Sequence, residues 1–136
     1  MINFSMSNHD VDVSTFEKEW TQLAKEICLV IYQNPEIQKF KKNLQENGFL
    51  NLEEKSAFIN ISDKIKYELI YHRYGPEGSP GYKRFNDAWK EWFRFKGVAS
   101  LGDEGQRTNI GHIMFGSTPD PIEFLTRSEE EIIKNS

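Results

Sequence analysis

Apolar side chains recur at helical spacing through most of this chain, and these series predict its helices. The first series is Phe16, Trp20, Leu23, Ile27 and Ile31. Residues three and four apart share one face of a helix, so the stretch predicts a helix with one buried face. Ser14 and Glu17 have the spacing of a capping box, and we expect the helix to begin at Ser14. Residues 1–12 lack such a series, which predicts an irregular segment before one helical domain at 13–136.

A second helix is predicted between a cap signal and a stop signal. Asn34 suits the N-cap and Pro35 the first helical position, whereas Gly48 suits a left-handed stop after Asn47. The apolar side of this helix carries Ile37, Phe40 and Leu44.

A third helix is predicted from Asn51, which forms a second capping box with Glu54. Its apolar series is Phe58, Ile61, Ile65 and Leu69, and His72 continues the series towards Tyr74. Asn60 and Ser62 fall within the series and would allow two shorter helices. We favour one long helix.

The stretch GYKRFNDAWKEWFRFKG at 81–97 follows a clear break at 74–81 and is the most aromatic part of the chain. Its rings are Tyr82, Phe85, Trp89, Trp92, Phe93 and Phe95. They recur at helical spacing, and large rings on one helical face are usually buried. We therefore expect this helix, like the helix from Ser14, to be packed in the core.

The C-terminal part gives less regular signals. Residues 98–109 are small and polar and predict a loop. The apolar run at 110–117 fits a short strand, a buried helical turn or irregular structure, and the lack of a partner strand disfavours the strand. Asp120 and Pro121 mark the start of a last helix, which Ser128 would interrupt.

These elements predict an all-α fold, a single domain of five or six helices. The chain has 136 residues, of which 38% are hydrophobic and 28% charged, as in an ordinary folded domain. Cys28 is the only cysteine, which excludes an internal disulfide and a cysteine-based zinc cluster. Its apolar neighbours in the sequence indicate that the thiol is buried. A single cysteine without a disulfide is typical of a reducing compartment. Without a signal peptide or an apolar run of membrane-spanning length, we expect a cytoplasmic protein.

An enzyme is our second alternative, as a small metal-dependent nuclease. His112, Arg107 and Glu123 would serve metal-dependent or acid–base cleavage of a phosphodiester. No histidine pair has zinc-helix spacing, and no glycine-rich phosphate loop is present. Glu123 is also explained as part of the helix cap at Asp120. We expect no cofactor.

A nucleic-acid-binding protein is the first alternative, because basic residues accompany the rings of helix 82–97. These residues are Lys83, Arg84, Lys90 and Arg94. Cations neutralise phosphates and exposed rings stack on bases. The net charge of −4 does not fit the basic footprint expected for this class.

The function that we favour is a protein-binding module that blocks another macromolecule by covering its surface. Acidic residues concentrate towards both ends of the chain and suit a basic partner, such as a toxin or a nuclease. Immunity proteins and small inhibitors share this profile of short, helical, acidic chains, which is an analogy of profile rather than of a motif. The expected partner-binding residues are Glu77, Trp92, Asp103, Glu104, Arg107, Glu129, Glu130 and Glu131.

Overall fold

The computed structural model describes residues 4–97, 108–117 and 120–128. This part of the chain forms six α-helices and one π-helical turn, without a strand. The elements are α1 (Phe4–Gln33), α2 (Pro35–Asn47), α3 (Leu52–Tyr74), α4 (Pro80–Trp92), the π-turn η1 (Phe93–Gly97), α7 (Asn109–Met114) and α8 (Pro121–Ser128). The predicted all-α fold is confirmed. The run at 110–117 contains α7 in place of the short strand that we considered.

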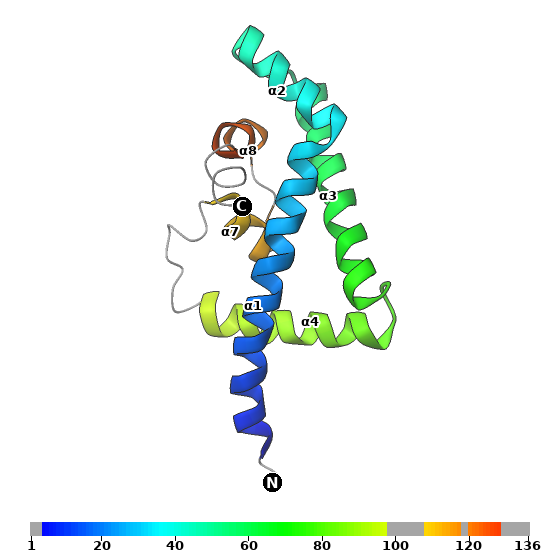
Figure 1. Ribbon diagram of the computed structural model, residues 1–136, viewed down its shortest axis with the longest axis vertical. Coiled ribbons are helices and arrows are strands. Elements are labelled where there is room, and N and C mark those ends of the chain that lie inside the picture. Colours follow the sequence, from blue (N-terminus) through cyan, green and yellow to red (C-terminus); the bar gives the residue numbers. More distant parts are fainter. Residues whose placement is uncertain (1–3, 98–107, 118–119, 129–136) are drawn as a thin grey trace.

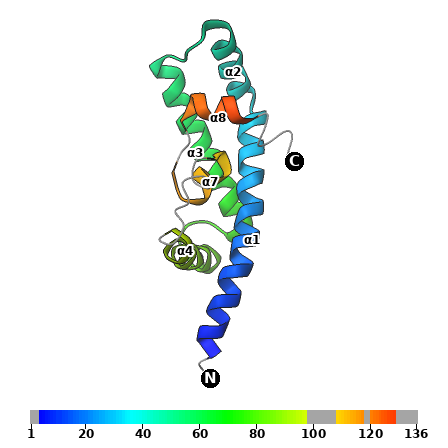
Figure 2. The same ribbon diagram turned by 90° about the vertical axis from the view of Figure 1, so that its left-hand side faces the viewer.

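Helix α1 is the long axis on which the other helices assemble (Figures 1 and 2). It contacts α2, α3, α4 and α7, while α8 packs against α3 and α7. Helix α4 crosses α1 at a steep angle, and the N-terminal turns of α1 extend past this crossing. None of the helices described has the length and apolar character needed to cross a bilayer.

The start of α1 differs from the prediction. The helix begins at Phe4 and passes through Ser14, so the expected cap at Ser14 and the irregular segment at 1–12 are wrong for residues 4–12. The reason lies in the sequence, because 4–13 contains neither glycine nor proline to stop a helix. Serine followed by glutamate three residues later occurs inside helices as well as at their ends.

The other predicted caps are confirmed. The Asn34 side chain accepts hydrogen bonds from the backbone N–H groups of Glu36 and Ile37, at 2.8 and 3.2 Å. Gly48 ends α2 at φ 81°, in the left-handed region that glycine favours. Asn51 and Glu54 form the capping box of α3, which continues as one helix to Tyr74.

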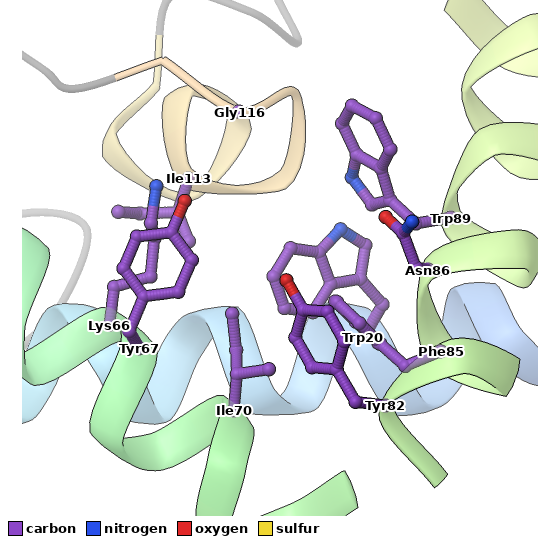
Figure 3. A pocket seen from close by; sticks show the side chains of 10 residues that line it. All are labelled: Trp20, Lys66, Tyr67, Ile70, Tyr82, Phe85, Asn86, Trp89, Ile113 and Gly116. Atoms are coloured by element: carbon purple, nitrogen blue, oxygen red, sulfur yellow. The ribbon is translucent and has the colours of Figure 1, made fainter. Parts of the chain in front are cut away.

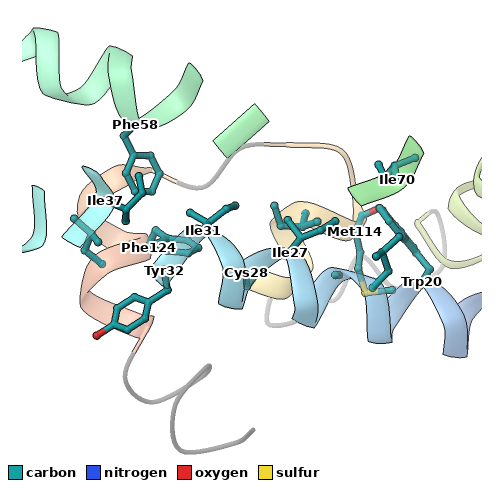
Figure 4. Packing of buried hydrophobic residues seen from close by; sticks show 14 of the residues in the cluster. Trp20, Ile27, Cys28, Ile31, Tyr32, Ile37, Phe58, Ile70, Met114 and Phe124 are labelled. Atoms are coloured by element: carbon teal, nitrogen blue, oxygen red, sulfur yellow. The ribbon is translucent and has the colours of Figure 1, made fainter. Parts of the chain in front are cut away.

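The core follows the predicted apolar face of α1 (Figure 4). Ile27, Cys28 and Ile31 are fully buried, so the thiol behaves as a small apolar group. Towards the α2 end, Phe58 of α3 meets Phe124 of α8 edge to face, with ring centroids 5.4 Å apart. Burial of these faces supplies the main favourable free energy of folding.

Helix α4 contributes one face of its rings to the core. Phe85 and Trp92 are buried, Trp89 is half-buried, and Phe95 is 64% exposed. The helix can lie close to the end of α3 because Gly81 has no side chain, since a Cβ there would lie 2.0 Å from the Tyr74 carbonyl oxygen. The prediction of a core helix is therefore confirmed for the ring positions that face α1.

Replacing Trp92 tests this packing. We expect Trp92→Ala to lower the free energy of unfolding by about 3 to 5 kcal/mol, because it leaves a large cavity in the core. Phe95→Ala is the matched control, and its effect should stay within about 0.5 kcal/mol because the ring is largely in solvent. Chemical denaturation measures both. Equal effects of the two variants would contradict the assignment of Trp92 to the core.

Candidate functional site

A single backbone carbonyl, that of Met114, joins three helices. It accepts hydrogen bonds from the indole N–H of Trp20 on α1, at 3.1 Å, and from that of Trp89 on α4, at 2.8 Å. The sulfur of the same methionine accepts a weak hydrogen bond from the Thr21 hydroxyl at 3.7 Å. The two indoles are thereby held at fixed angles beside α7.

A pocket of about 200 Å³ lies beside these indoles (Figure 3). Its buried floor consists of Trp20, Ile70, Phe85 and Ile113. Its more exposed rim consists of Tyr67, Tyr82, Asn86 and Trp89. Since both indole N–H groups already bond to Met114, the polar groups left to face a ligand come from Lys66, the two tyrosines and Asn86.

Gly116 completes the wall of the pocket next to Trp89. Its φ of 84° is in the left-handed region, and a Cβ at this position would lie 3.3 Å from Cζ2 of Trp89. Glycine therefore lets the chain turn after α7 and pass close to the indole.

Lys66 is the one charged side chain among the described residues that line the pocket. It extends from α3 towards α7 and is only 9% exposed (Figure 3). Its ammonium nitrogen lies 4.9 Å from the centroid of the Tyr67 ring, within the range of a cation–π contact. Burial lowers the pKa of Lys66 below its ordinary 10.5, and Asp63 partly opposes this. In the described part of the chain no carboxylate reaches it within ion-pair distance.

The residues of the enzyme alternative are only partly brought together. His112 and Glu123 interact electrostatically, and Glu123 pairs with Arg127 at 2.9 Å. Burial, followed by the charge of Arg127, lowers the pKa of His112, and Glu123 opposes the shift. Arg107 lies outside the described residues. Within the described ranges no group of three metal-ligating side chains is present.

The expected partner-binding residues have different outcomes. Glu77 is exposed in the turn between α3 and α4, as a contact residue requires. Trp92 is wrong as a surface anchor, because it is 2% exposed and its indole N–H donates to the Glu17 carboxylate at 3.2 Å. It faces α1 from the buried side of α4. The others, Asp103, Glu104, Arg107, Glu129, Glu130 and Glu131, lie outside the described residues.

The four cations of the nucleic-acid alternative are exposed, three on α4 and Arg94 on the π-turn η1, and acids of α4 accompany them. Lys83 pairs with Asp87 at 3.1 Å, and Arg94 pairs with Glu91. Arg84 shares a groove with Asp87, Glu91 and Glu19. Lys90 is exposed on the same helix. Because acids alternate with the cations, this face of α4 is a mixed-charge surface.

A surface that the sequence analysis missed lies at the turn between α2 and α3. Phe49 is 59% exposed and Leu52 is 80% exposed, whereas Leu50 between them is 3% exposed. We call the segment Glu46–Glu54 the α2–α3 tip. A signal was present in the sequence, because Phe49 lies between the helix stop at Gly48 and the cap at Asn51, and Leu52 directly follows that cap, and neither belongs to a predicted apolar series.

The other missed residue is Lys66. It continues a buried row at intervals of four residues, which contains Phe58, Ser62, Lys66 and Ile70. A lysine in a buried register would have been a signal for a polar site.

Comparison of the chain with protein-family models, with curated proteins and with solved structures gives no match in any of the three.

The environment of His112 predicts a pH effect on stability. Its pKa in the folded protein is below the ordinary 6.5, so the unfolded chain takes up the proton first as the pH falls. We expect the free energy of unfolding to decrease between about pH 7 and about pH 5, and His112→Gln to remove part of that decrease. Glutamine can keep the hydrogen bond that His112 Nδ1 shares with Ser117.

Denaturation curves across this pH range measure the effect. His72→Gln, which removes an exposed histidine of α3, is the matched control. If His112→Gln and the wild type have parallel pH profiles, the lowered pKa of His112 is wrong.

Proposed function

We propose that this protein is a binding module that covers the surface of a basic partner protein and blocks it, without catalysis or a cofactor. The observation that carries the proposal is the exposure of Phe49 and Leu52 at the α2–α3 tip, at 59% and 80%. Large apolar side chains that are exposed to solvent are typical anchors of a protein–protein interface.

The tip is held in one conformation before any partner binds. The Gly48 N–H donates to the Leu44 carbonyl at 2.8 Å and closes the end of α2. The Asn51 side chain accepts from the Glu54 N–H at 2.8 Å, and Glu54 accepts from the Asn51 N–H at 2.9 Å. Asn43 of α2 also donates to Glu54 at 2.6 Å, which links the two helices. A preorganised surface loses little conformational entropy when it binds.

The charges of the tip indicate the chemistry of the partner. The segment 46–54 contains Glu46, Glu53 and Glu54 and no lysine or arginine, and the next lysines in the sequence are Lys42 and Lys55. An apolar pair bordered by carboxylates complements an apolar pocket bordered by basic side chains. A toxin or nuclease that binds nucleic acid carries such basic surface, so the proposed role is that of an inhibitor or immunity protein.

The alternatives have less support. The cations of α4 and η1 alternate with acids, and Lys83 and Arg94 already pair with acids of α4. Nucleic acid would have to displace those pairs. For a nuclease, the described residues bring His112 near Glu123 but assemble no metal site.

A photo-crosslinking residue at position 49, introduced in the native cell, tests the proposal. We expect it to capture one basic protein in a nuclease-resistant complex, and the same residue at position 30 to capture none. Val30 is the matched position, because it is an apolar residue of α1 that is 37% exposed. The captured protein is then purified, and its activity is measured with and without the module.

The double substitution Phe49→Ser and Leu52→Ser gives the quantitative readout. We expect at least about tenfold weaker binding to the captured protein, which is about 1.4 kcal/mol. Stability should change by no more than about 0.5 kcal/mol, because both side chains are exposed. Val30→Ser should leave the affinity unchanged. Unchanged affinity of the double variant, or capture at position 30 but not at position 49, would refute the proposal.

A further inference from the structure

The pocket beside Met114 combines aromatic walls with one buried cation, and the proposed protein-binding function does not use it. The pocket is lined by residues of α1, α3, α4 and α7 (Figure 3). The α2–α3 tip is at the end of α3 that lies away from α4 (Figure 1). An inference about the pocket is therefore independent of the partner at the tip.

Among the described residues, no carboxylate lies within ion-pair distance of the Lys66 ammonium. Moving a charged amine into a pocket costs free energy unless a counter-charge or hydrogen-bond acceptor compensates it. The ring of Tyr67 at 4.9 Å supplies part of that compensation. Asp63, one turn earlier on α3, favours the charged form of Lys66, but the two side chains do not form an ion pair with each other. An oxygen anion in the pocket would pair with the ammonium directly, as no carboxylate of the described residues does.

The remaining polar groups of the pocket are suited to the same anion. The hydroxyl groups of Tyr67 and Tyr82 are at the rim (Figure 3). Burial, followed by the neighbouring Tyr71, Glu77 and Tyr67, raises the pKa of Tyr82, so its hydroxyl keeps its proton and can donate. Tyr67 and Asn86 add a second hydroxyl donor and an amide donor.

The size and walls of the pocket limit the rest of the ligand. An apolar cavity of about 150 Å³ holds one benzene ring, and this pocket has about 200 Å³. The indoles of Trp20 and Trp89 are fixed by Met114 and offer flat walls for a ring. One ring with one small polar substituent fills this space.

We propose that the pocket binds a small aromatic carboxylate, whose ring packs against Trp20 and Trp89 and whose carboxylate pairs with Lys66. A single cation matches a singly charged group better than it matches a phosphate. A neutral ring would leave the ammonium without its counter-charge, so the charged ligand binds more tightly than its neutral analogue.

Titration with benzoate, followed by NMR, tests this site. We expect saturable shifts of the Ile113 and Gly116 amides and of the Trp20 and Trp89 indole N–H signals. Benzamide, which has the same shape without the charge, should bind at least about tenfold more weakly. Lys66→Met should abolish this preference. Lys64→Met, which removes an exposed lysine two residues away on α3, should preserve it.

Lys66→Gln is a second variant that also removes the charge. It keeps the test valid if the Lys66→Met protein does not fold. The proposal is overturned if benzoate at millimolar concentration moves none of these signals, or if it binds no better than benzamide. A preference for benzoate that persists without Lys66 would overturn it as well. If inorganic phosphate produces the same shifts and displaces benzoate, the site is a general anion site and the aromatic specificity is wrong.

Discussion

The carbonyl of Met114 is the constraint on which the arrangement of the helices depends. It accepts the indole N–H groups of Trp20 and Trp89, and so it fixes α1, α4 and α7 relative to one another. Two donors occupy both lone pairs of the oxygen, and each indole gains a partner that it needs once it leaves water. Both indoles line the pocket, together with Lys66, Tyr67 and Ile70 of α3.

Two features of the structure, the α2–α3 tip and the pocket around Lys66, do not stabilise the fold. At one end of α3, the caps of α2 and α3 hold Phe49 and Leu52 in solvent, in a segment bordered by glutamates. Near the other end, Lys66 is buried in an aromatic pocket without a carboxylate in the described part of the chain at ion-pair distance. Exposed apolar groups and buried charges both disfavour the folded chain by itself, and both become favourable when a partner covers the apolar groups or a ligand pairs with the charge.

The helices could be predicted from the sequence because their signals are local. The Asn34 and Asn51 caps and the stop at Gly48 depend on neighbouring residues, and all three were found. The start of α1 was missed because a serine–glutamate spacing does not distinguish a cap from a helix interior. The pocket was missed because it depends on distant contacts, such as that of Trp20 with Met114. Likewise, the burial of Trp92 could not be predicted, because it depends on contacts with α1, such as the hydrogen bond from its indole N–H to Glu17.

The most direct test of the account is the stability of Lys66→Met, because the central claim is that this lysine serves a ligand and not the fold. Methionine keeps the length and apolar stem of the side chain and removes the charge that must be buried. The account predicts that chemical denaturation without ligand will show the variant to be more stable than the wild type, by about 1 kcal/mol. A variant that is less stable by a similar amount would mean that Lys66 supports the fold, and it would contradict the account.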